Sequence, residues 1–331
     1  MKFEIDPKLA KAMARMGPRA AYGSMMYNFV RDGCDFVTMS ADLGRSSGLE
    51  RLRKEFPERF YNVGIAEQSL VAVAAGMARE GETVFASSFA PFISMRASEH
   101  VRVNLSYMRE PVKLIGLGSG FSLGFLGNTH YGLEDYAIMN ALPNLTILCP
   151  ADAASVGKAI LAAAEIDGPV YIRLTGEAGS PNVYNQDYDL TVGKFNPVTI
   201  RQDSKIAIIG CGAILSECLE ASKTLSEQDI FADVFDCHSI KPFDVEGARR
   251  IFTRYPLVVS VEEHFLNGGL FSILSQIKVA NDYPGSLRGL GVDDSWVAPG
   301  ERSYVLDQLG LNAQAVAAKV KDYLNGNGVQ I

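Results

Sequence analysis

The stretch PERFYNVGIAEQSLVAVAAGMARE, residues 57–80, carries the pattern that decides the fold. Its second part, 64–80, has Ala, Val and Leu on nearly every face of a helix, which predicts a helix packed on several sides. Short apolar runs flank it, at 35–40 before it and at 83–87 after it. Strands separated by a helix of this length indicate a parallel sheet covered on both faces.

The alternation of strands and helices continues in both directions and predicts an α/β protein. The stretch 177–197 is rich in Gly, Pro, Asn and Asp and interrupts the alternation, so we place a linker at 181–197, between domains at 1–180 and 198–331. The further predicted elements are strands 112–116, 145–150, 169–173, 205–210, 229–236 and 256–263 and helices 91–108, 133–140, 152–166, 213–225, 244–254, 269–279 and 313–324.

Composition narrows the class of protein without giving a function. The 331 residues carry a net charge of −7, which argues against a general affinity for nucleic acid. The sequence has no run of 18 apolar residues, so it predicts no membrane-spanning helix. The N-terminus does not resemble a secretory signal. The five cysteines are scattered and form no CxxC pair, so we expect a cytoplasmic protein with reduced thiols and no metal site of its own.

Glu67 is the first candidate for chemistry, because it stands at the start of an otherwise apolar helix. One interpretation is structural: a carboxylate near a helix N-terminus complements the helix dipole. The other is catalytic: a carboxyl group in apolar surroundings can share a proton with a nitrogen base. The residues around Glu67 leave both open.

A glycine-rich loop at 116–132 holds six glycines in seventeen residues and ends in Asn128, Thr129 and His130. Its spacing does not fit a dinucleotide fingerprint, which makes a nicotinamide dehydrogenase a poor alternative. We expect a substrate-cleft loop, although a lone histidine is also common as a structural residue. Phe89 and Phe92 are spaced as core residues, and they would equally suit a flat heteroaromatic ring.

Taken together, the chain resembles the transketolase family over about residues 15–325. The motifs that carry the resemblance are RAAYG (19–23), SADLGRSS (40–47), PERFYNVGIAEQ (57–68), SFAPF (88–92) followed by Arg96 and Arg102, NTHYGLED (128–135), NLTILCPADA (144–153) and VEEHFLNGG (261–269). The resemblance implies a pyrimidine-binding domain, with a parallel sheet and helices on both faces, followed by the family's C-terminal α/β domain.

The resemblance also implies a cofactor, thiamine diphosphate, and assigns residues to it. Glu67 falls on the catalytic glutamate that bonds the aminopyrimidine, Phe92 on the aromatic residue that stacks on that ring, and Phe89 and Asp42 beside the cofactor. The implied substrate residues are His130 as the cleft histidine, Asn128 before it, and Arg19 and Ser46 at the distal phosphate of the sugar.

One family motif is absent from the sequence. Transketolases hold the diphosphate and its Mg²⁺ through a GDG motif in an N-terminal domain, and no GDG occurs here. The resemblance therefore implies a separate N-terminal subunit that carries this motif, holds the Mg²⁺ and forms an α2β2 assembly. We expect two-carbon ketol transfer between sugars, with activity only when that partner is present.

Three family positions in the cleft differ here. Leu126 stands where the family has an aspartate, Gly118 where it has a phosphate-contacting histidine, and Gly176 where it has an arginine. Losing charged contacts weakens phosphate binding, so we predict an unusual sugar: deoxy, branched, sulfonated or nucleotide-linked. The alternatives are acyl transfer, as in 1-deoxyxylulose-5-phosphate synthase or 2-oxoacid dehydrogenase β chains, and a non-catalytic regulatory subunit.

Overall fold

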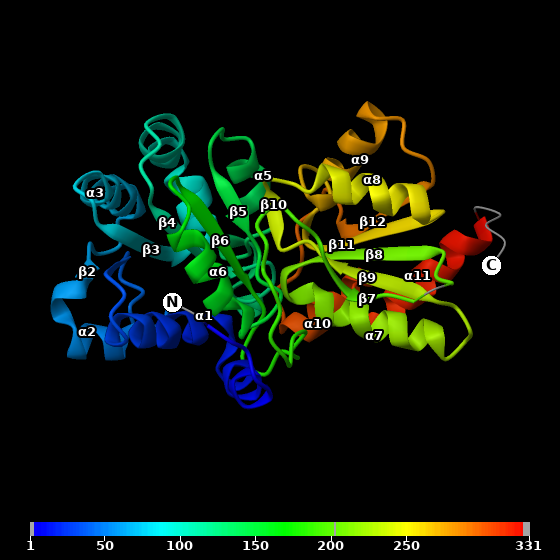
Figure 1. The fold of residues 1–331 in the computed structure, drawn as a ribbon, viewed down its shortest axis with the longest axis horizontal. Helices are drawn as coiled ribbons and strands as arrows, with labels where there is room; N and C mark the ends of the chain where they lie inside the picture. Colours follow the sequence, from blue (N-terminus) through cyan, green and yellow to red (C-terminus); the bar gives the residue numbers. More distant parts are fainter. Residues whose placement is uncertain (1–2, 202, 327–331) are drawn as a thin grey trace.

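The computed structural model describes residues 3–201 and 203–326, so the outer limits of the predicted domains, 1 and 331, lie outside the described residues. Two sheets lie side by side along the long axis of the molecule, with helices on both faces (Figure 1). This arrangement confirms the predicted α/β class. None of the helices in the described part is long and apolar enough to cross a membrane.

The first sheet has the strand order β10-β5-β6-β4-β3-β1-β2, and its strands run parallel except for β10. Its strands are β1 (Phe36–Ser40), β2 (Phe60–Asn62), β3 (Thr83–Phe89), β4 (Lys113–Ser119), β5 (Thr146–Leu148), β6 (Val170–Thr175) and β10 (Ser239–Lys241). β10 comes from the second half of the chain and pairs with β5, so it covers what would otherwise be an exposed edge.

Helices cover both faces of the first sheet because successive side chains of a strand point to opposite faces. Phe85 and Ile115 face a layer built from α1 and α6, whereas Val84 and Leu114 face α3 and the helical segment after Pro91. The helices are α1 (Pro7–Arg31), α2 (Glu50–Glu55), α3 (Glu67–Arg79), α4 (Ser98–His100) within the helical stretch Phe92–Tyr107, α5 (Asp135–Asn140) and α6 (Ser155–Ala164).

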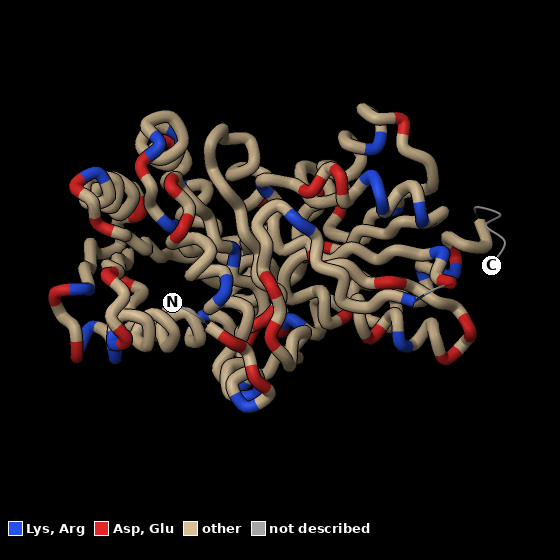
Figure 2. The backbone as a smooth tube through the Cα atoms, viewed as in Figure 1, with Lys and Arg blue, Asp and Glu red and all other residues tan. Residues whose placement is uncertain are grey.

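The second sheet has the order β12-β11-β8-β9-β7 and is parallel apart from β7 at its edge. Its strands are β7 (Asn196–Thr199), β8 (Ile206–Cys211), β9 (Ala232–Asp236), β11 (Leu257–Phe265) and β12 (Ser286–Val292). Its helices are α7 (Leu215–Ser226), α8 (Val245–Arg254), α9 (Leu270–Ala280), α10 (Arg302–Leu309) and α11 (Ala313–Gly326). Acidic and basic residues are interspersed over both halves of the molecule (Figure 2).

The structure corrects the prediction for α3. The helix starts at Glu67 rather than at Gly64, because Gly64 has a φ of 74° and breaks the helical path. It packs on two sides, against the sheet and against the helical stretch Phe92–Tyr107, while Val73 is exposed. The predicted packing on several sides is therefore confirmed, and only the outer face around Val73 is left uncovered within the described residues.

Seven elements of the structure were absent from the sequence prediction: α1, α2, α10, β2, β7, β10 and β12. α1 is interrupted by a kink at Gly17, which is followed by Pro18. Such a pair usually ends a helix, so the sequence pattern does not indicate one helical layer over residues 7–31. The short strands β2 and β10 are three residues long and exist only through their pairing partners.

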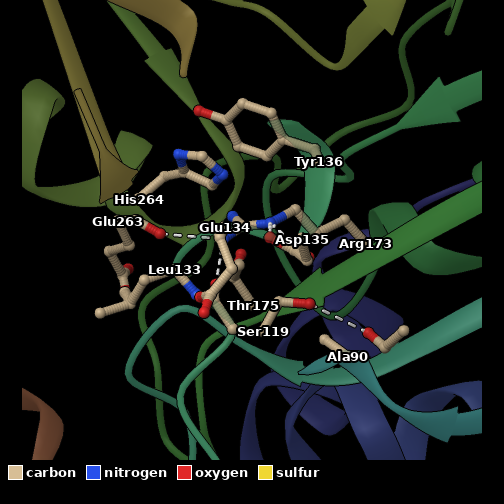
Figure 3. A network of polar contacts seen from close by, with 12 residues as sticks. Ala90, Ser119, Leu133, Glu134, Asp135, Tyr136, Arg173, Thr175, Glu263 and His264 are labelled. Atoms are coloured by element: carbon tan, nitrogen blue, oxygen red, sulfur yellow. Dashed lines mark hydrogen bonds and ion pairs between the residues drawn. The ribbon is translucent and has the colours of Figure 1, made fainter. Parts of the chain in front are cut away.

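Arg173 lies at the junction of the two sheets and is completely buried (Figure 3). Its Nε is 2.9 Å from both carboxylate oxygens of Asp135, and its Nη2 donates to the carbonyl oxygens of Gly132 and Glu263, each at 2.9 Å. Tyr171 donates a further hydrogen bond to Asp135, at 2.8 Å. One guanidinium therefore connects β6, α5 and β11, which belong to both halves of the chain.

We expect Asp135→Ala to lower the free energy of unfolding by about 3–5 kcal/mol, because it leaves the buried Arg173 charge unpaired. Urea unfolding measures this loss. The control is Asp32→Ala, which removes an ion pair with Arg31 at the surface and should leave the free energy of unfolding nearly unchanged. Equal losses for the two variants would show that the Arg173 pair does not hold the junction.

Candidate active site

The predicted site residues lie around the carboxyl ends of parallel strands of the first sheet. Asp42 follows β1, Phe89 ends β3, and the glycine-rich loop follows β4. Open α/β sheets bind ligands at this edge, because the loops that leave neighbouring strands converge there.

Glu67 is 2% exposed at the first turn of α3. Its Oε1 accepts a hydrogen bond from the Ser88 hydroxyl at 3.2 Å, and its Oε2 lies 2.8 Å from Nη1 of Arg96. The sequence had suggested purely apolar surroundings for this carboxylate. It is buried, but Ser88 and Arg96 give it two polar partners. Ser88 and Arg96 are site residues to which the sequence analysis had assigned no role.

Three rings form a cluster that Arg96 links to Glu67, because its guanidinium bonds Glu67 and lies over the Phe92 ring. The centroid of the His130 ring is 5.2 Å from that of Phe92 and 5.9 Å from that of Phe89, and the two phenylalanine rings are 6.0 Å apart. Phe89 and Phe92 are half-buried, so each ring keeps part of its surface open. The structure therefore brings together four of the predicted site residues: Glu67, Phe89, Phe92 and His130.

The glycine-rich loop is held by residues from the second half of the chain. The Asn128 side chain donates to the Val297 carbonyl at 2.8 Å and accepts from the Val297 amide at 3.2 Å. The Phe121 amide donates to Oε2 of Glu263 at 3.2 Å. A Cβ at Gly120, where φ is 62°, would lie 2.9 Å from the same oxygen, so this glycine permits the close contact.

Asn128 therefore has a structural role in addition to any contact with a substrate. Thr129, which the sequence placed beside it, has its hydroxyl 2.9 Å from Nδ1 of His130. This contact orients the histidine ring. Asn128 therefore holds the loop, and Thr129 orients His130.

Glu263 is itself held by Arg302, whose Nε lies 3.1 Å from Oε1 and 3.2 Å from Oε2 of that carboxylate. Next to this pair the His264 ring stacks on Tyr136 with centroids 3.9 Å apart (Figure 3). Burial lowers the pKa of His264 to about 4, so the ring is neutral near pH 7. Burial raises the pKa of Glu262 to about 7, against the opposing effect of hydrogen bonds from Tyr136 and two backbone amides.

Asp42 lies in the loop after β1 with a φ of 59°, a conformation that non-glycine residues adopt rarely. Its amide donates to Oδ1 of Asn62 at 3.0 Å, and its Oδ1 accepts from Nδ2 of Asn62 at 3.1 Å. The same Oδ1 of Asn62 accepts from the Gly64 amide at 3.0 Å. Asn62, unassigned by the sequence analysis, fixes the turn that leads into Glu67.

Arg19 and Ser46 line a common cavity of about 90 Å³ with Gly176 and Glu177. Burial lowers the pKa of Arg19, and burial raises the pKa of the Glu177 carboxyl. The structure thus brings together the two residues predicted for a distal anion, and it adds an acidic neighbour that opposes a phosphate. No cluster of three or more His, Cys, Asp or Glu suited to a metal ion occurs in residues 3–201 and 203–326.

Two domain families match the sequence. Residues 15–179 match the family described as "Transketolase, pyrimidine binding domain", and residues 196–316 match "Transketolase, C-terminal domain". The chain belongs to the transketolase family. The first sheet belongs to the pyrimidine-binding domain and the second sheet to the C-terminal domain. β10 lies in the C-terminal domain by sequence but pairs with β5 of the first sheet.

Several transketolase-family proteins resemble the chain over most of its length. An apulose-4-phosphate transketolase subunit from Actinobacillus succinogenes is 35% identical, covering 87% of this chain and 92% of that protein. The 6-deoxy-6-sulfo-D-fructose transketolase subunit SqwH of Clostridium sp. is 31% identical, covering 90% and 91%. A solved structure of a split gene transketolase, an inactive beta4 tetramer, is 35% identical with a TM-score of 0.82, covering 94% and 98%.

We expect Asn128→Ala to speed amide hydrogen exchange at Gly127 and His130 by about tenfold, because two hydrogen bonds that hold this transketolase loop are lost. The control is Asn281→Ala, which removes one exposed hydrogen bond to the Ile277 carbonyl at 2.8 Å. Unchanged exchange at the two loop positions would show that Val297 does not hold the loop.

Proposed function

We propose that this chain is the pyrimidine-binding subunit of a two-chain transketolase that transfers a two-carbon ketol unit between sugars with thiamine diphosphate, with the domain boundary at 181–197. The observation that carries the proposal is the position of Glu67, a buried carboxylate that Arg96 links to the half-buried Phe92 ring. A carboxylate at the edge of an aromatic stacking face suits a flat ring with a basic nitrogen.

The residues fit an aminopyrimidine, because a planar cation already makes the same two kinds of contact. The Arg96 guanidinium bonds Glu67 and lies over the Phe92 ring, with its central carbon 4.3 Å from the ring centroid. Thiamine diphosphate, when bound, would supply the nucleophile and the electron sink for two-carbon transfer. Glu67 holds and moves a proton at the pyrimidine nitrogen, Phe92 and Phe89 orient the ring, and Asp42 lies on the cofactor side.

On the substrate side, His130 projects toward the same aromatic cluster and can donate to or accept from a sugar oxygen. Asn128 keeps this histidine in place by holding its loop. Arg19 and Ser46 would read an anionic group at the far end of the sugar, in the cavity that they share.

The need for a partner rests on sequence and surface together. No GDG occurs in the chain, so the diphosphate and Mg²⁺ fall to a separate N-terminal transketolase subunit in an α2β2 assembly. Apolar side chains near the Glu67 end of α3 and on the adjacent helical segment are exposed, with Ile65 at 79% and Tyr107 at 84%. Exposed apolar side chains mark a surface that another chain covers when they form a continuous patch, and the proposed partner would cover these two.

The proposed preference for an unusual sugar rests on Gly118 and Gly176, which stand where the family has a histidine and an arginine. Gly118 has a φ of 68° and Gly176 a φ of 90°, so a histidine or arginine at either position would be strained. A Cβ at Gly118 would lie 2.9 Å from Leu123, and one at Gly176 would lie 3.0 Å from Ala213. The backbone conformation at these two positions thus disfavours the charged side chains that would bind a phosphate. Relatives named for apulose 4-phosphate and for a sulfonated fructose support an unusual sugar.

The central test is reconstitution with the N-terminal transketolase chain, thiamine diphosphate and Mg²⁺. We expect ketol transfer from the mixture and none from either chain alone or after chelation of the metal. Glu67→Gln should lower kcat by at least about 100-fold, since it removes a group that moves a proton. The surface variant Glu220→Gln, which affects only an exposed pair with Lys223, should keep full activity.

Two outcomes would contradict this function. Full activity of Glu67→Gln would leave a non-catalytic, regulatory subunit as the better description. Release of carbon dioxide from pyruvate, without ketol transfer, would indicate acyl transfer.

Donor specificity gives a separate test. We expect kcat/KM to be at least about tenfold higher on 6-deoxy-6-sulfofructose than on xylulose 5-phosphate, because charge-assisted contacts to a phosphate are missing at positions 118 and 176 and a sulfonate carries only one negative charge. Apulose 4-phosphate, which carries a phosphate on a branched sugar, is the third donor. Steady-state kinetics on the three donors measures the ratio. A preference for xylulose 5-phosphate would refute the unusual sugar while leaving the transketolase chemistry in place.

A further inference from the structure

Arg96 makes two contacts at once. Its Nη1 lies 2.8 Å from Oε2 of Glu67, and its guanidinium carbon lies 4.3 Å from the centroid of the Phe92 ring. The first contact uses the carboxylate that the proposed function assigns to the pyrimidine nitrogen. The second uses the aromatic face assigned to the pyrimidine ring. Both contacts come from a single planar cation.

Arg96 and the aminopyrimidine of the cofactor would compete for Glu67 and Phe92. A guanidinium and an aminopyrimidine are both flat, nitrogen-rich groups that can stack on an aromatic face and hydrogen-bond in their own plane. The same oxygen of Glu67 and the same face of Phe92 cannot serve both in one geometry. A ring that reaches Glu67 across Phe92 must therefore displace Arg96.

We propose that Arg96 is a placeholder for the aminopyrimidine: it pairs with Glu67 and covers Phe92 in the free chain, and it leaves both when the cofactor ring enters. This inference rests on the proposed function, because it takes thiamine diphosphate as the ligand of Glu67.

In the free chain, the ion pair between Arg96 and Glu67 stabilises the fold. Glu67 is 2% exposed, and a buried carboxylate without a partner strongly destabilises the folded state. Ser88 satisfies one oxygen with a neutral hydroxyl, and Arg96 neutralises the charge at the other. The placeholder thus keeps the site folded and ordered before the cofactor arrives.

Arg96 is also able to leave. Its side chain is 47% exposed, so its charge can return to water without being buried elsewhere. It ends the stretch Phe92–Arg96, which has π-helical turns, a geometry that is frequent at functional sites. The cost of displacement lowers the apparent cofactor affinity, since only the fraction of molecules with Arg96 displaced can bind.

The experiment measures the Kd of thiamine diphosphate by calorimetry in the two-chain complex with Mg²⁺. Arg96→Met removes the competing cation, and we expect the Kd to fall by about tenfold, which is the loss of one charge-assisted hydrogen bond as a competitor. Arg96→Lys keeps a charge for Glu67 without a flat group to stack, and its Kd should fall between those of the parent and Arg96→Met. Arg249→Met is the matched control: Arg249 is 50% exposed, bonds a carboxylate at 2.9 Å, and should leave the Kd unchanged.

Thermal unfolding of the free chain gives a readout that does not depend on the cofactor. Arg96→Met should lower the Tm, because Glu67 loses its ionic partner, whereas Arg249→Met should not. If Arg96→Met does not fold, Arg96→Lys decides the matter through its Kd.

A Kd that is unchanged or higher in the Arg96 variants overturns the placeholder role and leaves the proposed function intact. Absence of cofactor binding in the parent complex itself would overturn the proposed function.

Discussion

The buried guanidinium of Arg173 is the interaction on which the rest of the structure depends. It bonds the Asp135 carboxylate on α5 and the backbone of Gly132 and Glu263, so it joins the end of the glycine-rich loop to the C-terminal domain. A charge buried this deeply is tolerated only when its donors are satisfied, which makes the relative position of these elements specific. The two sheets are therefore held by directional contacts as well as by apolar packing.

The shape of the proposed substrate cleft follows from this junction. The loop that carries His130 starts in the first sheet, but Glu263 and Val297 of the C-terminal domain hold it. Gly120 allows the close approach, since any side chain there would meet the Glu263 carboxylate. The C-terminal domain thus shapes the site without supplying a residue to the aromatic cluster around Glu67.

At the proposed cofactor side, partners from the same chain hold the Glu67 carboxylate in a buried position. Glu67 is anchored by α3 and Ser88, and Arg96 neutralises it from a half-exposed position. Ile65 before α3 and Val73 on its outer face are exposed, and a two-chain assembly would cover them. Burial, charge and surface composition at this end of the molecule all suit a site that is completed by other molecules.

The sequence by itself determined the α/β class, the order of the main strands and helices, and the residues that carry the family motifs. These follow from local signals: the period of apolar residues, the turn-forming stretches, and short motifs such as the one around Glu67. The predicted residues Phe89, Phe92 and His130 are close together in space because Phe89 ends a predicted strand, Phe92 begins a predicted helix and His130 lies in the predicted glycine-rich loop.

Only the tertiary structure decided the partners of these residues. The ion pair between Glu67 and Arg96 spans 29 positions, and the contact between Asn128 and Val297 spans 169. β10 joins the first sheet from beyond residue 238, and the kinked α1 is recognisable only by the face of the sheet that it covers. Contacts between distant segments depend on how whole elements pack, and no local pattern in the sequence encodes that packing.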